Sequence, residues 1–119
     1  MPFMFEDLMA YKKAMEFAKK VFSLSKNIRD RTIKDQLCRA ALSIPLNIAE
    51  GQGRFHQREK RQFYNTAKGS LYECVPLIQL CFHLGFFGEG HYNNLDELAN
   101  ESGKILAGLI KSVSKENRD

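Results

Sequence analysis

The segment spanning residues 36–54 constrains the fold of this chain more than any other stretch. Its apolar residues recur at spacings of three and four, the period of one face of an α-helix. The residues on this face are Leu37, Ala41, Ile44 and Ile48. Pro45 removes a hydrogen bond inside the helix and therefore predicts a kink. Gly51 and Gly53 can adopt positive φ, which predicts that the helix stops and the chain turns there.

The same helical period runs through three further segments of the 119-residue chain. No segment alternates apolar and polar residues as a strand would. Asp30 stands where its carboxylate can accept from free amides and cap the second helix. Short connections favour antiparallel neighbours, so we predict a single domain, residues 1–119, folded as an all-α, up-down-up-down four-helix bundle. The predicted helices cover residues 7–26, from the Asp30 cap to 51, 57–84 and 92–113.

The third predicted helix carries two further expectations. Gly69 costs about 1 kcal/mol relative to alanine inside a helix, so we expect it where a side chain would clash with a neighbouring helix. Three aromatic residues, Phe82, Phe86 and Phe87, lie near the end of this helix. They either cap the core or form an exposed patch for another subunit, and the sequence leaves both open.

A row of polar residues shares the second helix with the apolar face. It comprises Arg39, Ser43, Asn47 and Glu50, and Glu73 of the third helix can join it. Arg39 and Glu50 lie three helical turns apart, roughly 16 Å, so each needs another partner. We interpret the row as structural or as an interface. Asn47 and Glu50 would satisfy backbone groups freed by Pro45 and the glycine turn. Arg39 would pair with Glu73 or with a neighbouring subunit.

The basic residues are concentrated in one half of the chain. Residues 12–68 contain 14 Lys or Arg against 5 Asp or Glu, whereas residues 69–119 contain 4 against 7. This asymmetry favours a polyanionic partner, RNA or DNA. The strongest candidate is the basic turn before and within the start of the third helix, where free amides also favour anions and an aromatic ring can stack on a base. The candidate residues are Arg54, Phe55, His56, Arg58, Lys60, Arg61 and Lys68. The alternative is an ordinary solvated helix start.

Several function classes find no support in the sequence. The polar row lacks a nucleophile or paired acid, and there is no phosphate loop or catalytic triad pattern, so we expect no enzyme, no cofactor and no small-molecule substrate. The three cysteines and three histidines lack metal-ligand spacing, so no metal site is expected. Unpaired cysteines in apolar patterns indicate a reduced, cytoplasmic protein. Acidic residues near the start and no run of ~20 apolar residues argue against a signal peptide and a membrane span.

The central segments also carry a family resemblance. The runs RAA (39–41), SIP (43–45), NIAEG (47–51) and GR (53–54) precede Phe63, Ala67, GSL (69–71) and Glu73. Together with FEDL (5–8) and LGF (84–86), they resemble the four-helix-bundle proteins encoded in intervening sequences of bacterial 23S ribosomal RNA genes. The similarity extends over most of the chain, and it implies the same fold.

The resemblance also implies partners. Proteins of this family, and the similar accessory variability proteins of diversity-generating retroelements, form ring-like homo-oligomers, with a pentamer as the expected size, and the accessory proteins bind nucleic acid. We therefore expect a non-enzymatic, self-assembling bundle that binds RNA or DNA through a basic surface. The alternative is an oligomeric structural or protein-binding scaffold without nucleic-acid binding.

Overall fold

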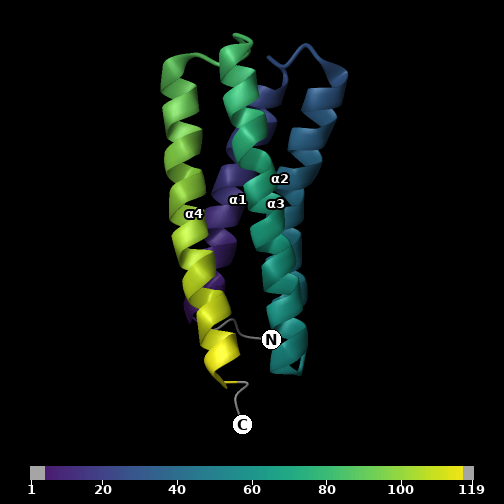
Figure 1. Ribbon diagram of the computed structural model, residues 1–119, viewed down its shortest axis with the longest axis vertical. Coiled ribbons are helices and arrows are strands. Elements are labelled where there is room, and N and C mark those ends of the chain that lie inside the picture. The colour runs from purple at the N-terminus through teal and green to yellow at the C-terminus, as the bar shows by residue number, and fades with distance from the viewer. Residues whose placement is uncertain (1–4, 117–119) are drawn as a thin grey trace.

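The computed structural model describes residues 5–116, which form four long α-helices joined by short connections (Figure 1). They are α1 (Phe5–Ser25), α2 (Arg31–Gln52), α3 (Gln57–His83) and α4 (Glu89–Glu116). The helices run alternately up and down and make a rod 50 Å long and 23 Å across. The turn between α2 and α3 lies at the lower end in Figure 1, and the other two connections lie at the upper end.

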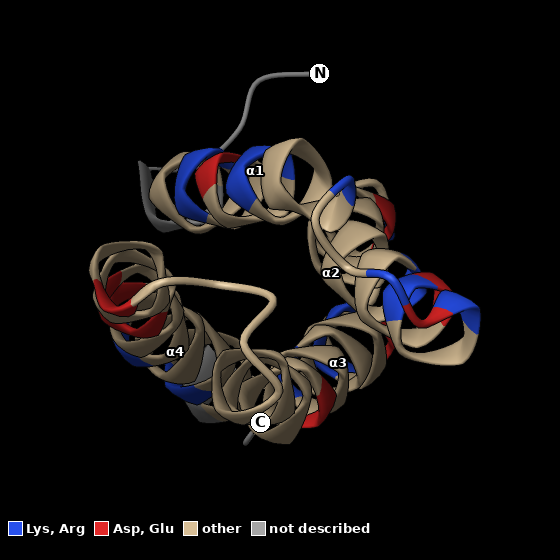
Figure 2. Ribbon diagram, turned by 90° about the horizontal axis from the view of Figure 1, so that it is seen from above, with Lys and Arg blue, Asp and Glu red and all other residues tan. Residues whose placement is uncertain are grey.

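Each helix packs against two neighbours. Consecutive helices are in contact, and α4 closes the ring against α1, as the view from above shows (Figure 2). The inward faces form one continuous hydrophobic core. Its largest side chains are Phe17, Leu37, Ile44, Ile48, Tyr64, Ile78, Leu95 and Leu106. This arrangement confirms the predicted all-α, up-down-up-down four-helix bundle.

The helix boundaries follow local capping chemistry. The Asp30 carboxylate accepts from the Ile33 amide at 2.9 Å, which confirms the predicted cap of α2. Helix α2 continues through Pro45, whose ring is fully buried, so core packing helps to offset the lost hydrogen bond. Helix α4 begins at Glu89, earlier than predicted, because Gly85 with φ of 80° already completes the turn out of α3.

Gly51 has a different role from the one predicted. It is still helical, and Gly53, which ends α2, has φ of −79°, so neither residue uses positive φ. A Cβ atom on Gly51 would instead lie 2.6 Å from Cε1 of Tyr64 and 3.1 Å from Cβ of Phe63. The missing side chain therefore lets α2 and α3 approach closely where the buried Tyr64 ring lies between them.

The expectation for Gly69 is wrong. A Cβ atom there would meet nothing within 4 Å, because Gly69 points outward from α3 rather than toward a neighbouring helix. The conformational cost of this glycine has no compensation in the packing of the described chain.

The aromatic residues near the end of α3 cap the core rather than forming an exposed patch. Phe87 is buried, and Phe86 packs against the core from a partly buried position. The Phe82 ring stacks on Tyr92 of α4, with centroids 4.6 Å apart. Together these rings close the upper end of the bundle between α3 and α4.

We predict that Gly51→Ala lowers the free energy of unfolding by about 1–3 kcal/mol, because the new methyl group collides with the Tyr64 ring. Gly108→Ala in α4 is the control: its Cβ has open space, so replacing a helical glycine should stabilise by up to about 1 kcal/mol. Urea unfolding at one fixed protein concentration measures both. Equal effects of the two substitutions would contradict the close approach of α2 and α3.

Candidate nucleic-acid interface

The basic turn is a short connection at the lower end of the rod. Helix α2 closes with backbone hydrogen bonds from Gly53 to the Ala49 carbonyl and from Arg54 to the Gly51 carbonyl. Helix α3 begins at Gln57, and His56 before it makes no side-chain capping hydrogen bond. The first-turn amides of α3 thus receive no capping side chain, which leaves them available to an anion.

Two cations of this turn are engaged within the chain. The Arg54 guanidinium pairs with Glu50 at 2.8 Å and lies 4.6 Å from the centroid of the Phe63 ring. The Lys60 ammonium donates to the carbonyl of Gln52 at 3.0 Å and to that of Gly51 at 3.4 Å. Lys60 therefore caps the last carbonyl groups of α2, of which that of Gly51 also accepts from the Arg54 amide, and fastens α3 to α2.

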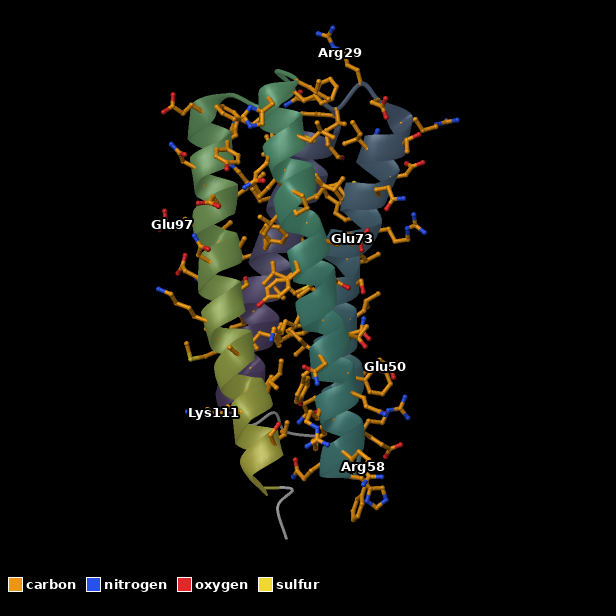
Figure 3. The ribbon with its side chains drawn as sticks, in the orientation of Figure 1. Arg29, Glu50, Arg58, Glu73, Glu97 and Lys111 are labelled. Carbon is orange, nitrogen blue, oxygen red and sulfur yellow. The ribbon has the colours of Figure 1, made fainter. Side chains whose placement is uncertain are left out.

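Three other residues of the basic turn are available to a partner. Phe55 is 89% exposed, and its ring meets His56 edge-to-face with centroids 5.3 Å apart. Arg58 is exposed at the lower end of the bundle (Figure 3), and its guanidinium forms no ion pair with the side chains that the structure describes, residues 8–114. Phe55, His56 and Arg58 form what we call the tip.

The remaining predicted residues lie farther along α3. Arg61 is half-buried, and no ion pair joins it to the part of the chain that the structure describes. Lys68 lies about three helical turns from the start of α3, roughly 16 Å, with its ammonium 5.6 Å from the Tyr72 ring centroid. The structure thus groups three of the predicted residues at the tip and separates Lys68 from them.

Part of the polar row on α2 joins this helix to α3 by a hydrogen bond. Ser43 and Ser70 share a hydrogen bond of 2.8 Å that joins α2 to α3. Asn47 donates to the hydroxyl and the carbonyl of Ser43, at 2.9 and 2.8 Å. The sequence analysis missed Ser70 as the cross-helix partner, although a hydroxyl among small inward residues was a usable signal.

Two expectations about this row need correction. The hydrogen bond of the Glu50 carboxylate goes to the Arg54 guanidinium, four residues on and just after the end of α2, rather than to a backbone group. Asn47 bonds a backbone carbonyl, but that of Ser43, not the Ala41 carbonyl that Pro45 leaves free. Arg39 and Glu73 are both exposed and form no ion pair with each other, because exposed pairs gain little from being held together.

The thiols and histidines form no reactive centre in the described residues. No group of three or more His, Cys, Asp or Glu there could hold a metal ion. Burial raises the pKa of Cys74 to about 12 and that of Cys81 to about 11, so both thiols stay protonated near neutral pH and are poor nucleophiles. Among helices in the described range, none has the length and apolar character needed to cross a membrane.

Comparison with known proteins agrees with this geometry. The sequence model of the 23S rRNA-intervening sequence protein family matches residues 6–108. The chain belongs to this family. A solved structure from Bacteroides thetaiotaomicron VPI-5482, described as a protein with unknown function from the S23 ribosomal protein family, is similar with a TM-score of 0.82 and 22% identity. The match covers 86% of this chain and 98% of that one, and at this identity it supports the fold alone.

The family membership indicates no reaction. Neither the 23S rRNA-intervening sequence family nor the Bacteroides protein carries a description of an enzyme. No curated protein matches the chain.

We predict that Lys60→Met destabilises the protein by about 1 kcal/mol, because it removes two hydrogen bonds to the end of α2 while keeping the apolar stem. Arg58→Met, which also removes one charge from α3, should change the free energy of unfolding by less than about 0.5 kcal/mol. Urea titration at equal protein concentration compares them. If Arg58→Met lowers the free energy of unfolding as much as Lys60→Met does, Arg58 is not free of stabilising contacts, and the distinction between engaged and available cations is wrong.

Proposed function

We propose that this protein is a cytoplasmic, non-enzymatic, self-assembling four-helix bundle that binds RNA or DNA through the tip. The observation that carries this proposal is the 89% exposure of Phe55 beside His56 and the unpaired Arg58. An open aromatic ring beside a cation is the arrangement on which bases stack irrespective of sequence while the cation contacts the phosphate.

The tip supplies the parts of a phosphate-binding surface with little base-specific readout. The Arg58 guanidinium can neutralise a phosphate, and the uncapped amides at the start of α3 add a partial positive charge. Glu59 in the same turn opposes this charge and limits the affinity of one tip. Phosphate contacts position a nucleic acid without reading its sequence.

Self-assembly would compensate for a modest affinity per tip. The outward faces of α2 and α3 expose large apolar side chains: Leu42, Leu46, Tyr72 and Leu80. Tyr72 is 63% exposed, and the unexplained Gly69 lies one turn before it, where a second copy could approach closely. The family resemblance makes a ring of five subunits the expected assembly. Several tips on one particle bind a polymer far more tightly than one.

A structural scaffold without nucleic-acid binding is the second candidate. The same apolar side chains on α2 and α3 favour it, because they support self-assembly whether or not a nucleic acid binds. Arg54 and Lys60 bind groups within the chain, which also favours a scaffold, because two cations of the basic turn are then not available to a nucleic acid.

Fluorescence anisotropy with structured RNA, single-stranded RNA and duplex DNA, from about 50 to about 200 mM salt, tests the proposal. We expect binding that weakens steeply with salt. Phe55→Ala should weaken it by about 1–3 kcal/mol per stacked base without changing the salt slope. Arg58→Ala should lower the log–log slope by about 0.7 to 0.9. Lys104→Ala on α4 makes the same change in charge and should alter neither the affinity nor the salt slope.

Light scattering on the same samples separates the two candidates. A multimeric mass together with salt-sensitive binding that depends on Phe55 and Arg58 supports the proposal. A multimeric mass with no binding at the lowest salt contradicts nucleic-acid binding and leaves the scaffold function. A monomeric mass contradicts self-assembly in both.

A further inference from the structure

Helix α1 presents a row of lysines on the side opposite its core face. Lys12 and Lys19 lie on α1, and Lys26 directly follows its last residue, Ser25; the spacing of seven residues places them along one side at intervals of roughly 10 Å. All three are exposed, whereas the other side of α1 buries Phe17 and Val21. Figure 2 shows where Lys and Arg occur along α1.

The charges of this row are not neutralised within the described chain. Lys13, on the flank facing α4, takes the available acids: it pairs with Glu101 at 3.3 Å and with Glu16 at 3.7 Å. Glu16 is the only acid among the α1 side chains that the structure describes. No ion pair joins Lys12, Lys19 or Lys26 to the described side chains of residues 8–114.

The row ends in a polar hollow at the upper end of the rod. Lys26, Asn27 and Arg29 from the α1–α2 connection line it on one side, and residues 84–86 after α3 line the other. Arg29 projects from the upper end of the bundle (Figure 3). The nearest acid in sequence, Asp30, is occupied as the cap of α2. The cationic row therefore extends onto the end of the rod opposite the tip.

We propose that Lys12, Lys19, Lys26 and Arg29 form a second phosphate-binding surface, which holds the backbone of a nucleic acid lying along α1. From Lys12 on α1 to Lys26 directly after it, the three lysines span about 21 Å at the helical rise, long enough to contact several phosphates of one polymer. This inference rests on the proposed function and extends it from the tip to one whole side of the bundle. The ligand is the phosphodiester backbone, from a duplex or a single strand.

An anionic membrane is the competing partner for a basic helix. A helix that binds in a membrane interface turns its apolar face to the lipid. In α1 the main apolar face is turned to the core, and the outward side carries the lysines with Met15 and Phe22 exposed between them. Two separate side chains do not form the continuous apolar face that lipid insertion needs. Nucleic acid needs only the cations, so it fits this face better.

The test compares two double variants with equal charge and spacing. Lys12→Gln with Lys19→Gln removes two cations from the row, and Lys104→Gln with Lys111→Gln removes two exposed lysines, also seven residues apart, from α4. Salt-dependent anisotropy uses duplex DNA, duplex RNA and single-stranded RNA, with phosphatidylcholine–phosphatidylserine vesicles as a fourth probe. The α1 variant should lower the log–log salt slope by about 1.8 for duplex DNA and about 1.4 for a single strand. The α4 variant should leave the slope unchanged.

Each other outcome identifies what fails. Equal slopes in the two double variants would overturn the inference, since net charge alone would explain the effect. Normal binding by the α1 variant together with weak binding by Arg58→Ala overturns the α1 surface and leaves the tip in place. Absence of binding by the unmodified protein overturns both surfaces. Loss of vesicle binding in the α1 variant without nucleic-acid binding by the unmodified protein assigns the row to lipid.

Discussion

The close approach of α2 and α3 is the constraint on which the rest of this structure depends. Gly51 leaves room for the Tyr64 ring, and the hydrogen bond between Ser43 and Ser70 joins the same two helices farther up the bundle. Lys60 then ties the start of α3 to the last carbonyls of α2. Because the Gly51–Tyr64 contact and the Lys60 hydrogen bonds lie next to the α2–α3 turn, the exposed Phe55 is presented by a short connection between two joined helices rather than by a long loop.

All four helices bury their inward faces in one hydrophobic core, whereas the residue types on their outward faces differ from helix to helix. Helix α1 presents Lys12 and Lys19, which form no ion pair with the described side chains, with Met15 and Phe22 exposed beside them. Helices α2 and α3 present mainly apolar residues, and the outer face of α4 mixes acids and bases such as Glu97 and Lys111 (Figure 3). This segregation allows one small bundle to use different sides for different partners. Assembly through α2 and α3 would leave α1 facing outward, so the two proposed activities do not compete for the same surface.

Periodicity and capping were sufficient to predict the helices, because both are local properties of the sequence. The Asp30 cap and the four-helix bundle followed from them. Contacts between helices were less predictable, since two glycines with equal local preferences have opposite surroundings: Gly51 is packed against a ring and Gly69 is open. The candidate site shows the same limit. Composition located the basic turn, but only the structure distinguishes Lys60, which holds a helix end, from Arg58, which is unpaired.

The central claim is that nucleic acid contacts the tip and the outward side of α1. Ultraviolet cross-linking of the protein to bound RNA, followed by mass spectrometry of the linked peptides, tests it most directly. The account predicts cross-links at Phe55 or His56 and in peptides containing Lys19 or Lys26, with none on the outer face of α4. Cross-links concentrated around Lys104 and Lys111, or on the apolar faces of α2 and α3, would contradict it.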